Sequence, residues 1–210
     1  RPANIRKDTY GGSFENRTRF LKEIIEGIKS TVKSKNFILG SRISFYEGIR
    51  GGFGTSSPDE IIEDTREPLA LTDLMEEVGM HYINISAGMG GETPEMMRPT
   101  PTGRALSLHL LRYAKIVKEH LAARNAKLKV IGSGYTIFRD QAADLGEENI
   151  DKKYTDFAGF GRMTFSDPLY PIKLLSGEPI DYCKTCNGCS RLIAEQKPSG
   201  CIVYNKTVNK

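Results

Sequence analysis

The sequence predicts an α/β protein built on a parallel sheet, because short apolar runs alternate with longer helical patterns along the chain. Each run has the length and the β-branched or aromatic content of a buried strand. The four runs are 37–43 (FILGSRI), 81–86 (HYINIS), 128–131 (LKVI) and 157–160 (FAGF). Four strands fit either a small doubly wound sheet or half of a (β/α)8 barrel, since a whole barrel usually needs about 250 residues.

Two of the helices are predicted from apolar residues that recur at helical spacing. The set before the first strand consists of Phe20, Ile24, Ile25, Ile28 and Val32. The set between the second and third strands consists of Leu106, Leu110, Tyr113, Val117 and Leu121. Helices in these places would form the right-handed crossovers that join parallel strands.

A third helix is predicted between the first and second strands. Ser57-Pro58-Asp59-Glu60 has the pattern of a helix start, with a serine cap, proline in the first turn and glutamate three residues after the cap. Pro68 is expected to break this helix, because proline lacks the backbone N–H. The helix then resumes through Leu71, Leu74 and Val78.

Composition places the chain among ordinary globular proteins, with 39% hydrophobic and 27% charged residues in 210. The net charge of +4 is spread along the chain and does not indicate a nucleic-acid partner. No apolar run approaches the roughly 20 residues of a membrane span, and no signal peptide is recognisable. We therefore expect a cytoplasmic protein that binds neither nucleic acid nor membrane.

Polar residues and glycines lie where the predicted strands end, which is where parallel α/β folds bind ligands. The first strand carries Arg42, the third ends in Gly132-Ser133-Gly134-Tyr135, and the fourth ends in Gly159-Phe160-Gly161-Arg162. Glycine turns let backbone amides approach a phosphate, and arginine adds a charge-assisted bond. The alternatives are that the glycines only form tight turns and that Arg42 pairs with a neighbouring carboxylate.

All four cysteines lie between residues 183 and 201, with the spacing Cys183-x2-Cys186-x2-Cys189-x11-Cys201. A disulfide framework would join distant segments, so this cluster is more typical of a metal or iron–sulfur site in a reducing compartment. Four thiolates suit a 4Fe-4S cluster or a tetrahedral zinc ion, and free thiols are the third possibility.

Residues 4–20 (NIRKDTYGGSFENRTRF) closely resemble the NxRxDxYGGSxENRxRF signature of the Old Yellow Enzyme family, the NADH:flavin oxidoreductases that include 2,4-dienoyl-CoA reductase. Four further segments resemble family strands and the turn that follows the last of them: 41–44 (SRIS), 130–134 (VIGSG), 159–162 (GFGR) and 166–168 (SDP). The resemblance runs nearly from end to end.

The resemblance implies that residues 1–178 form the C-terminal half, strands five to eight, of an FMN-binding (β/α)8 TIM barrel, and that 179–210 form a short cysteine-rich extension. It places Arg42 at the N1/O2 edge of the flavin. Gly134, Tyr135, Gly161 and Arg162 would hold the FMN phosphate. The full set expected to bind the cofactor is Arg42, Gly132, Ser133, Gly134, Tyr135, Gly159, Gly161 and Arg162.

In the family, the substrate-orienting histidine pair and the proton-donating tyrosine precede the signature, so the resemblance places them upstream of Arg1. His81, His109 and His120 do not match that pair and are expected to be structural. Half a barrel exposes two strand edges, which predicts a missing N-terminal half or a partner chain. The chain alone is expected to be incomplete and inactive.

The implied function is part of an FMN-dependent enzyme that uses NAD(P)H to reduce an activated C=C bond in a small molecule, as ene reductases and dienoyl-CoA reductases do. The resemblance also implies that Cys183, Cys186, Cys189 and Cys201 hold a 4Fe-4S cluster. The alternative is a non-catalytic half-barrel module that binds a phosphate ligand or zinc.

Overall fold

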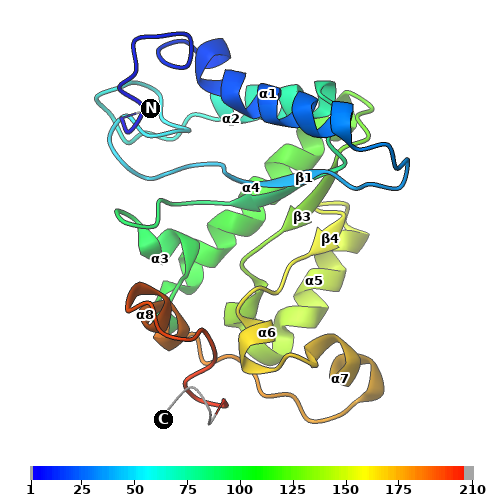
Figure 1. Cartoon of the computed structure of the whole chain (residues 1–210). Coiled ribbons are helices and arrows are strands. Elements are labelled where there is room, and N and C mark those ends of the chain that lie inside the picture. Colours follow the sequence, from blue (N-terminus) through cyan, green and yellow to red (C-terminus); the bar gives the residue numbers. More distant parts are fainter. Residues whose placement is uncertain (1, 206–210) are drawn as a thin grey trace.

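The computed structural model describes residues 2–205 and contains one four-stranded parallel sheet (Figure 1). The strands lie side by side in chain order: β1 (Gly40–Ser44), β2 (Tyr82–Ser86), β3 (Lys129–Gly132) and β4 (Phe157–Ala158). A doubly wound sheet reverses its strand order at a switch point. Here each strand is added beside the preceding one, which is the winding of a (β/α)8 barrel.

The strands are shorter than the apolar runs that predicted them. The first run starts at residue 37, but Phe37 and Ile38 are exposed and β1 begins at Gly40. The last run reaches residue 160, but only Phe157 and Ala158 are in β4. The Gly159 N–H still donates to the Gly132 carbonyl (2.8 Å) before the chain turns away.

The long helices follow the predicted alternation. They are α1 (Phe14–Thr31), α2 (Arg66–Glu77), α4 (Arg104–Ala123) and α5 (Ala142–Asp151). The shorter ones are α3 (Pro94–Met97), η1 (Pro101–Gly103), η2 (Tyr135–Gln141), α6 (Met163–Ser166), α7 (Tyr170–Ser176) and α8 (Gly188–Ala194). The first helix, α1, is capped by Ser13, whose hydroxyl accepts from the Asn16 N–H.

The predicted helix start at Ser57-Pro58-Asp59-Glu60 is wrong, and Pro68 does not break a helix. Residues 57–60 belong to a loop, in which the Gly51 N–H donates to the Glu60 carbonyl (2.8 Å). The helix α2 begins at Arg66, so Pro68 lies in its first turn. The N–H groups of a first turn have no intrahelical partner, so proline costs no hydrogen bond there.

Side chains alternate across the sheet and give it one packed face and one half-polar face. Ile83, Ile85 and Val130 point into the main core, where they pack with residues of α1, α2 and α4. The opposite face carries a row that is in register across all four strands. This row consists of Arg42, Asn84, Ile131 and Phe157.

The row is only partly covered, and the Phe157 side chain is 54% exposed. In the described part of the chain, no helix has both the length and the apolar character that crossing a bilayer requires.

Asp156 connects the third and fourth strands to α4 and is the basis of a stability prediction. Its carboxylate accepts from Lys118 Nζ (2.6 Å) and from the Val130 N–H (2.9 Å). Burial alone would raise the pKa of Asp156, but these bonds and the charges of Lys118 and Lys129 lower it overall. The carboxylate therefore stabilises the fold above the pKa of the unfolded chain, and this contribution is lost as the pH falls through the folded pKa.

We expect Asp156→Asn to lower the free energy of unfolding at neutral pH by about 1–2 kcal/mol, because charge-assisted bonds are lost. Its stability should also fall less than that of the wild type below about pH 4, where an unfolded aspartate begins to protonate. Urea unfolding across this pH range measures both effects. Asp59→Asn, at an exposed loop position, is the control. Equal pH profiles for wild type and Asp156→Asn would contradict the assignment.

Candidate functional site

A cavity of about 530 Å³ lies at the carboxyl ends of the strands and is called the polar cavity here. Its walls come from β1, β2, the turns after β3 and β4, the segment between β2 and α4, and α8. The polar and glycine residues that line it are Arg42, Asn84, Arg98, Ser133, Gly134, Thr136, Gly159, Gly161, Arg162, Thr164 and Ser190. No aspartate or glutamate lines it.

Six of the eight residues expected to bind a cofactor line this one cavity: Arg42, Ser133, Gly134, Gly159, Gly161 and Arg162. The other two, Gly132 and Tyr135, lie outside its lining. The Gly132 N–H donates to Thr155 Oγ1 (2.9 Å), and the Tyr135 ring is buried with its hydroxyl accepting from Asn149 Nδ2 (3.2 Å). The turns after β3 and β4 thus line the same cavity as Arg42 of β1.

Three arginines bring positive charge to the polar cavity. Arg42 donates to Ser86 Oγ (2.9 Å), and Arg162 donates to the Pro99 carbonyl (2.9 Å) and to Asn187 Oδ1 (3.0 Å). These acceptors are neutral, and within residues 2–205 neither arginine lies within ion-pair distance of a carboxylate. The salt bridge considered for Arg42 is therefore not found.

The electrostatics agree with this geometry. Burial lowers the pKa of Arg42 and of Arg162, and the neighbouring charge of Arg98 lowers both further. The thiols of Cys183, Cys186 and Cys189 act on Arg162 in the opposite direction. Arginine stays protonated in proteins, so the cavity holds positive charges that repel one another and lack a counter-charge. An anion is the ligand that such a site would bind.

The glycines divide into two kinds. Gly134 has φ +103°, and a Cβ there would lie 3.2 Å from Leu110 Cβ, so the turn itself requires glycine. A Cβ at Gly159 would lie 3.1 Å from the Gly132 carbonyl oxygen, which is again a local packing reason. At Gly161, no atom lies within 4 Å of a Cβ. The missing side chain of Gly161 leaves open space on the wall of the cavity.

Sequence reasoning missed Arg98. It lies between α3 and η1, in the segment 88–101 that follows β2 and also contains Met96 and Met97. Met97 does line the polar cavity, while Met96 packs against the main core. The position of Arg98 in the loop after the carboxyl end of a strand was the only sequence signal for a ligand-binding role, because loop residues follow no periodic pattern.

The four cysteines converge on a second, smaller cavity but do not form a metal site. Cys183, Cys186, Cys189 and Cys201 are free and line a space of about 20 Å³. In the described part of the chain, no three histidine, cysteine or acidic side chains are grouped closely enough to hold an ion. A space of this size holds about one water molecule. The arrangement therefore does not support the predicted ligand set of a 4Fe-4S cluster.

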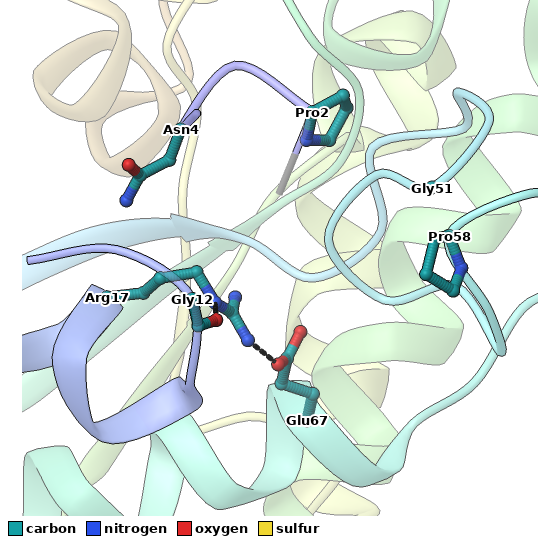
Figure 2. A pocket seen from close by; sticks show the side chains of 7 residues that line it. All are labelled: Pro2, Asn4, Gly12, Arg17, Gly51, Pro58 and Glu67. Carbon is teal, nitrogen blue, oxygen red and sulfur yellow. Dashed lines mark hydrogen bonds and ion pairs between the residues drawn. The ribbon is translucent and has the colours of Figure 1, made fainter. Parts of the chain in front are cut away.

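The signature residues near the N-terminus line a separate hollow, which Figure 2 shows. Arg17 pairs there with Glu67 and donates through Nε to the Gly12 carbonyl (3.0 Å). Both charged side chains are mostly buried, and the pair joins α1 to the first turn of α2. We assign a structural role to this ion pair.

The histidines also have structural partners and do not line the polar cavity. His81 Nδ1 accepts from the Leu39 N–H (2.9 Å), which fixes the chain at the start of the sheet. His120 Nε2 lies 2.7 Å from Asp73 Oδ1 and joins α4 to α2. His109 lies beside the Tyr113 ring.

Residues 2–181 match the family model described as NADH:flavin oxidoreductase / NADH oxidase family. The NADH oxidase of Thermoanaerobacter brockii is 30% identical over 89% of this chain and 26% of its own length. The bilirubin reductase of Mediterraneibacter gnavus is 27% identical over 95% of this chain and 29% of its own length. The NADPH dehydrogenase of Clostridium acetobutylicum is 32% identical over 62% of this chain and 39% of its own length.

The chain thus spans between 26% and 39% of the length of these curated relatives. Among solved structures, an old yellow enzyme homologue from Zymomonas mobilis is similar with a TM-score of 0.49 and 18% identity, covering 84% of this chain and 41% of that one.

Arg98 should contribute to anion binding in the polar cavity. We expect inorganic phosphate to raise the thermal unfolding temperature relative to chloride at equal ionic strength, since a ligand that binds only the folded state stabilises it. Arg98→Gln should weaken phosphate binding about tenfold or more, because a charge-assisted bond is worth roughly 1.5–3 kcal/mol. Arg124→Gln, at an arginine that follows α4, pairs with Asp73 of α2 and lies outside the cavity lining, is the control and should show the same phosphate effect as the wild type. An equal phosphate effect in both variants would show that Arg98 does not bind the anion.

Proposed function

The chain belongs to the NADH:flavin oxidoreductase / NADH oxidase family, and from this premise we propose that it is part of an FMN-dependent oxidoreductase that uses NADH or NADPH. The observation that carries the proposal is the polar cavity, where three arginines meet two glycine turns without a carboxylate in the lining. FMN suits such a cavity because its phosphate is an anion and its ring gains negative charge on reduction.

The residues of the cavity fit this cofactor. We assign Arg162, with the turns around Gly134 and Gly161, to the phosphate, since the open space beside Gly161 lets a ligand approach the backbone. We assign Arg42 to the pyrimidine edge of the flavin. Arg42 lies on β1, and its bond to Ser86 Oγ fixes the guanidinium (2.9 Å).

When bound, FMN supplies the two-electron chemistry by which a reduced nicotinamide drives the reduction of an activated C=C bond. The part of this chain is to hold positive charge in place before the reaction. Arg42 is already oriented and partly desolvated, so its charge stabilises developing negative charge without reorganising. Among the described residues, no histidine and no tyrosine lines the cavity. We therefore propose that the proton donor comes from outside this chain.

We further propose that residues 1–178 are strands five to eight of a (β/α)8 barrel and that an N-terminal half, or a partner chain, completes it. Within the described residues, β1 pairs only with β2 and β4 only with β3, which leaves two edges. The half-polar face that carries Arg42 and Asn84 is only partly covered. Parallel sheets are normally covered on both faces, and a closed barrel has no edges.

The role of Arg42 can be tested in the full-length native protein. We expect it to bind FMN, and we expect Arg42→Gln to retain FMN but to be reduced by NAD(P)H about a hundredfold more slowly, since loss of one preorganised donor typically costs 10²–10³ in rate. The reduction rate of Arg42→Lys should lie between those of the wild type and Arg42→Gln. Anaerobic stopped-flow absorbance measures the rates. A wild-type protein that cannot be reconstituted with FMN would instead favour the non-catalytic module.

The cysteine-rich segment is tested separately, because its metal content is independent of FMN. The arrangement of the four thiols predicts that all four react with a thiol reagent in unfolded, anaerobically purified protein and that iron and zinc are absent. Iron, zinc and acid-labile sulfide analysis gives the answer. The 4Fe-4S cluster implied by the family resemblance is the alternative, and iron with equimolar sulfide would show that the segment closes around it.

A further inference from the structure

The cysteine-rich segment borders the polar cavity through Cys189, Ser190 and Ile193, and the side chain of Asn187 joins the segment to Arg162 on the cavity wall. Asn187 follows Cys186 and precedes α8, and it has a left-handed backbone conformation with φ 56°. Its Oδ1 accepts from Arg162 Nη1 (3.0 Å), and its Nδ2 donates to the Arg98 carbonyl (3.1 Å). One amide therefore contacts both the arginine assigned to the phosphate and the backbone of the loop that carries a second arginine.

The contacts of Arg162 show what this amide does. Arg162 Nη1 donates to two acceptors, Asn187 Oδ1 and the Pro99 carbonyl (2.9 Å), and both are neutral. They fix the direction of the guanidinium without cancelling its charge, which stays available to a ligand. A carboxylate in the same place would hold the side chain but neutralise it.

We propose that Asn187 is a positioning residue that holds Arg162 at the wall of the polar cavity and thereby couples the conformation of the cysteine-rich segment to anion binding. The identity of the anion as the FMN phosphate rests on the proposed function. Coupling between two sites is reciprocal. A change in the segment that displaces Asn187 weakens anion binding, and a bound anion resists that displacement.

Asn187 can be changed without disturbing its backbone. Glycine adopts positive φ at no steric cost, so Asn187→Gly removes only the amide. Asn125 provides a matched control, because it is exposed, has φ 53° and lies just after α4, away from the polar cavity. Asn125→Gly therefore makes the same chemical change at the same kind of backbone position.

The experiment compares FMN with riboflavin, which has the same ring but no phosphate, in fluorescence titrations of the full-length native protein. Asn187→Gly should bind FMN about fivefold to tenfold more weakly, as expected for loss of a hydrogen bond that orients a charged group. Riboflavin binding should not change, and Asn125→Gly should match the wild type for both ligands. Asn187→Asp should weaken FMN binding more than Asn187→Gly, because its carboxylate would pair with Arg162.

Equal weakening of both ligands by Asn187→Gly would mean that Asn187 is only structural and would overturn the proposal. Unchanged FMN binding would overturn it as well, while leaving the proposed function intact.

A second readout does not depend on flavin. Inorganic phosphate should slow the reaction of the cysteines with a thiol reagent in the wild type and in Asn125→Gly, but not in Asn187→Gly. If the wild type binds neither flavin but shows this pattern, the proposed function fails and the coupling stands. If phosphate protects the thiols equally in all three proteins, or in none, the coupling is wrong.

Discussion

The alternation of side chains along the parallel strands is the constraint on which the rest of this structure depends. Each strand has two faces, and Ile83 and Ile85 of β2 point into the core shared with the helices. The residues between them must then face the other way, which places Asn84 beside Arg42. The sheet register thus determines both the apolar core and the placement of Arg42 and Asn84 side by side at the cavity.

The polar cavity is an electrostatic consequence of this arrangement. Partial desolvation of Arg42 and Arg162 without a carboxylate costs free energy, and the repulsion from Arg98, which also lowers their pKa values, adds to this cost. An anion that enters the cavity supplies the missing counter-charge and reduces the repulsion between the arginines. The unpaired arginines therefore lower the stability of the free protein and raise its affinity for an anion. This is typical of functional sites rather than of structural ion pairs such as Arg17–Glu67.

Sequence patterns predicted the parts of the molecule that follow a period or a fixed spacing. The four strands and the helices α1 and α4 were predictable from the spacing of apolar residues. Six cavity residues were predictable because strand ends are ligand positions in parallel folds. The helix start at Ser57 was wrong because hydrogen bonds to distant loop residues outweigh a local capping pattern. Arg98 and Asn187 could not be assigned, since their roles arise only when segments that are far apart in sequence meet.

The position of Asn187 has a consequence for the cysteine-rich segment. Gly188 packs against the Ile202 side chain, because a Cβ there would lie 2.1 Å from Ile202 Cδ1. A metal bound by the four cysteines would require Cys186 and Cys189 to move, because no three potential ligands of the described residues are placed to bind one ion. Asn187 lies between them and would move with them. The state of the cysteines and the orientation of Arg162 are therefore linked by the covalent chain as well as by the hydrogen bond.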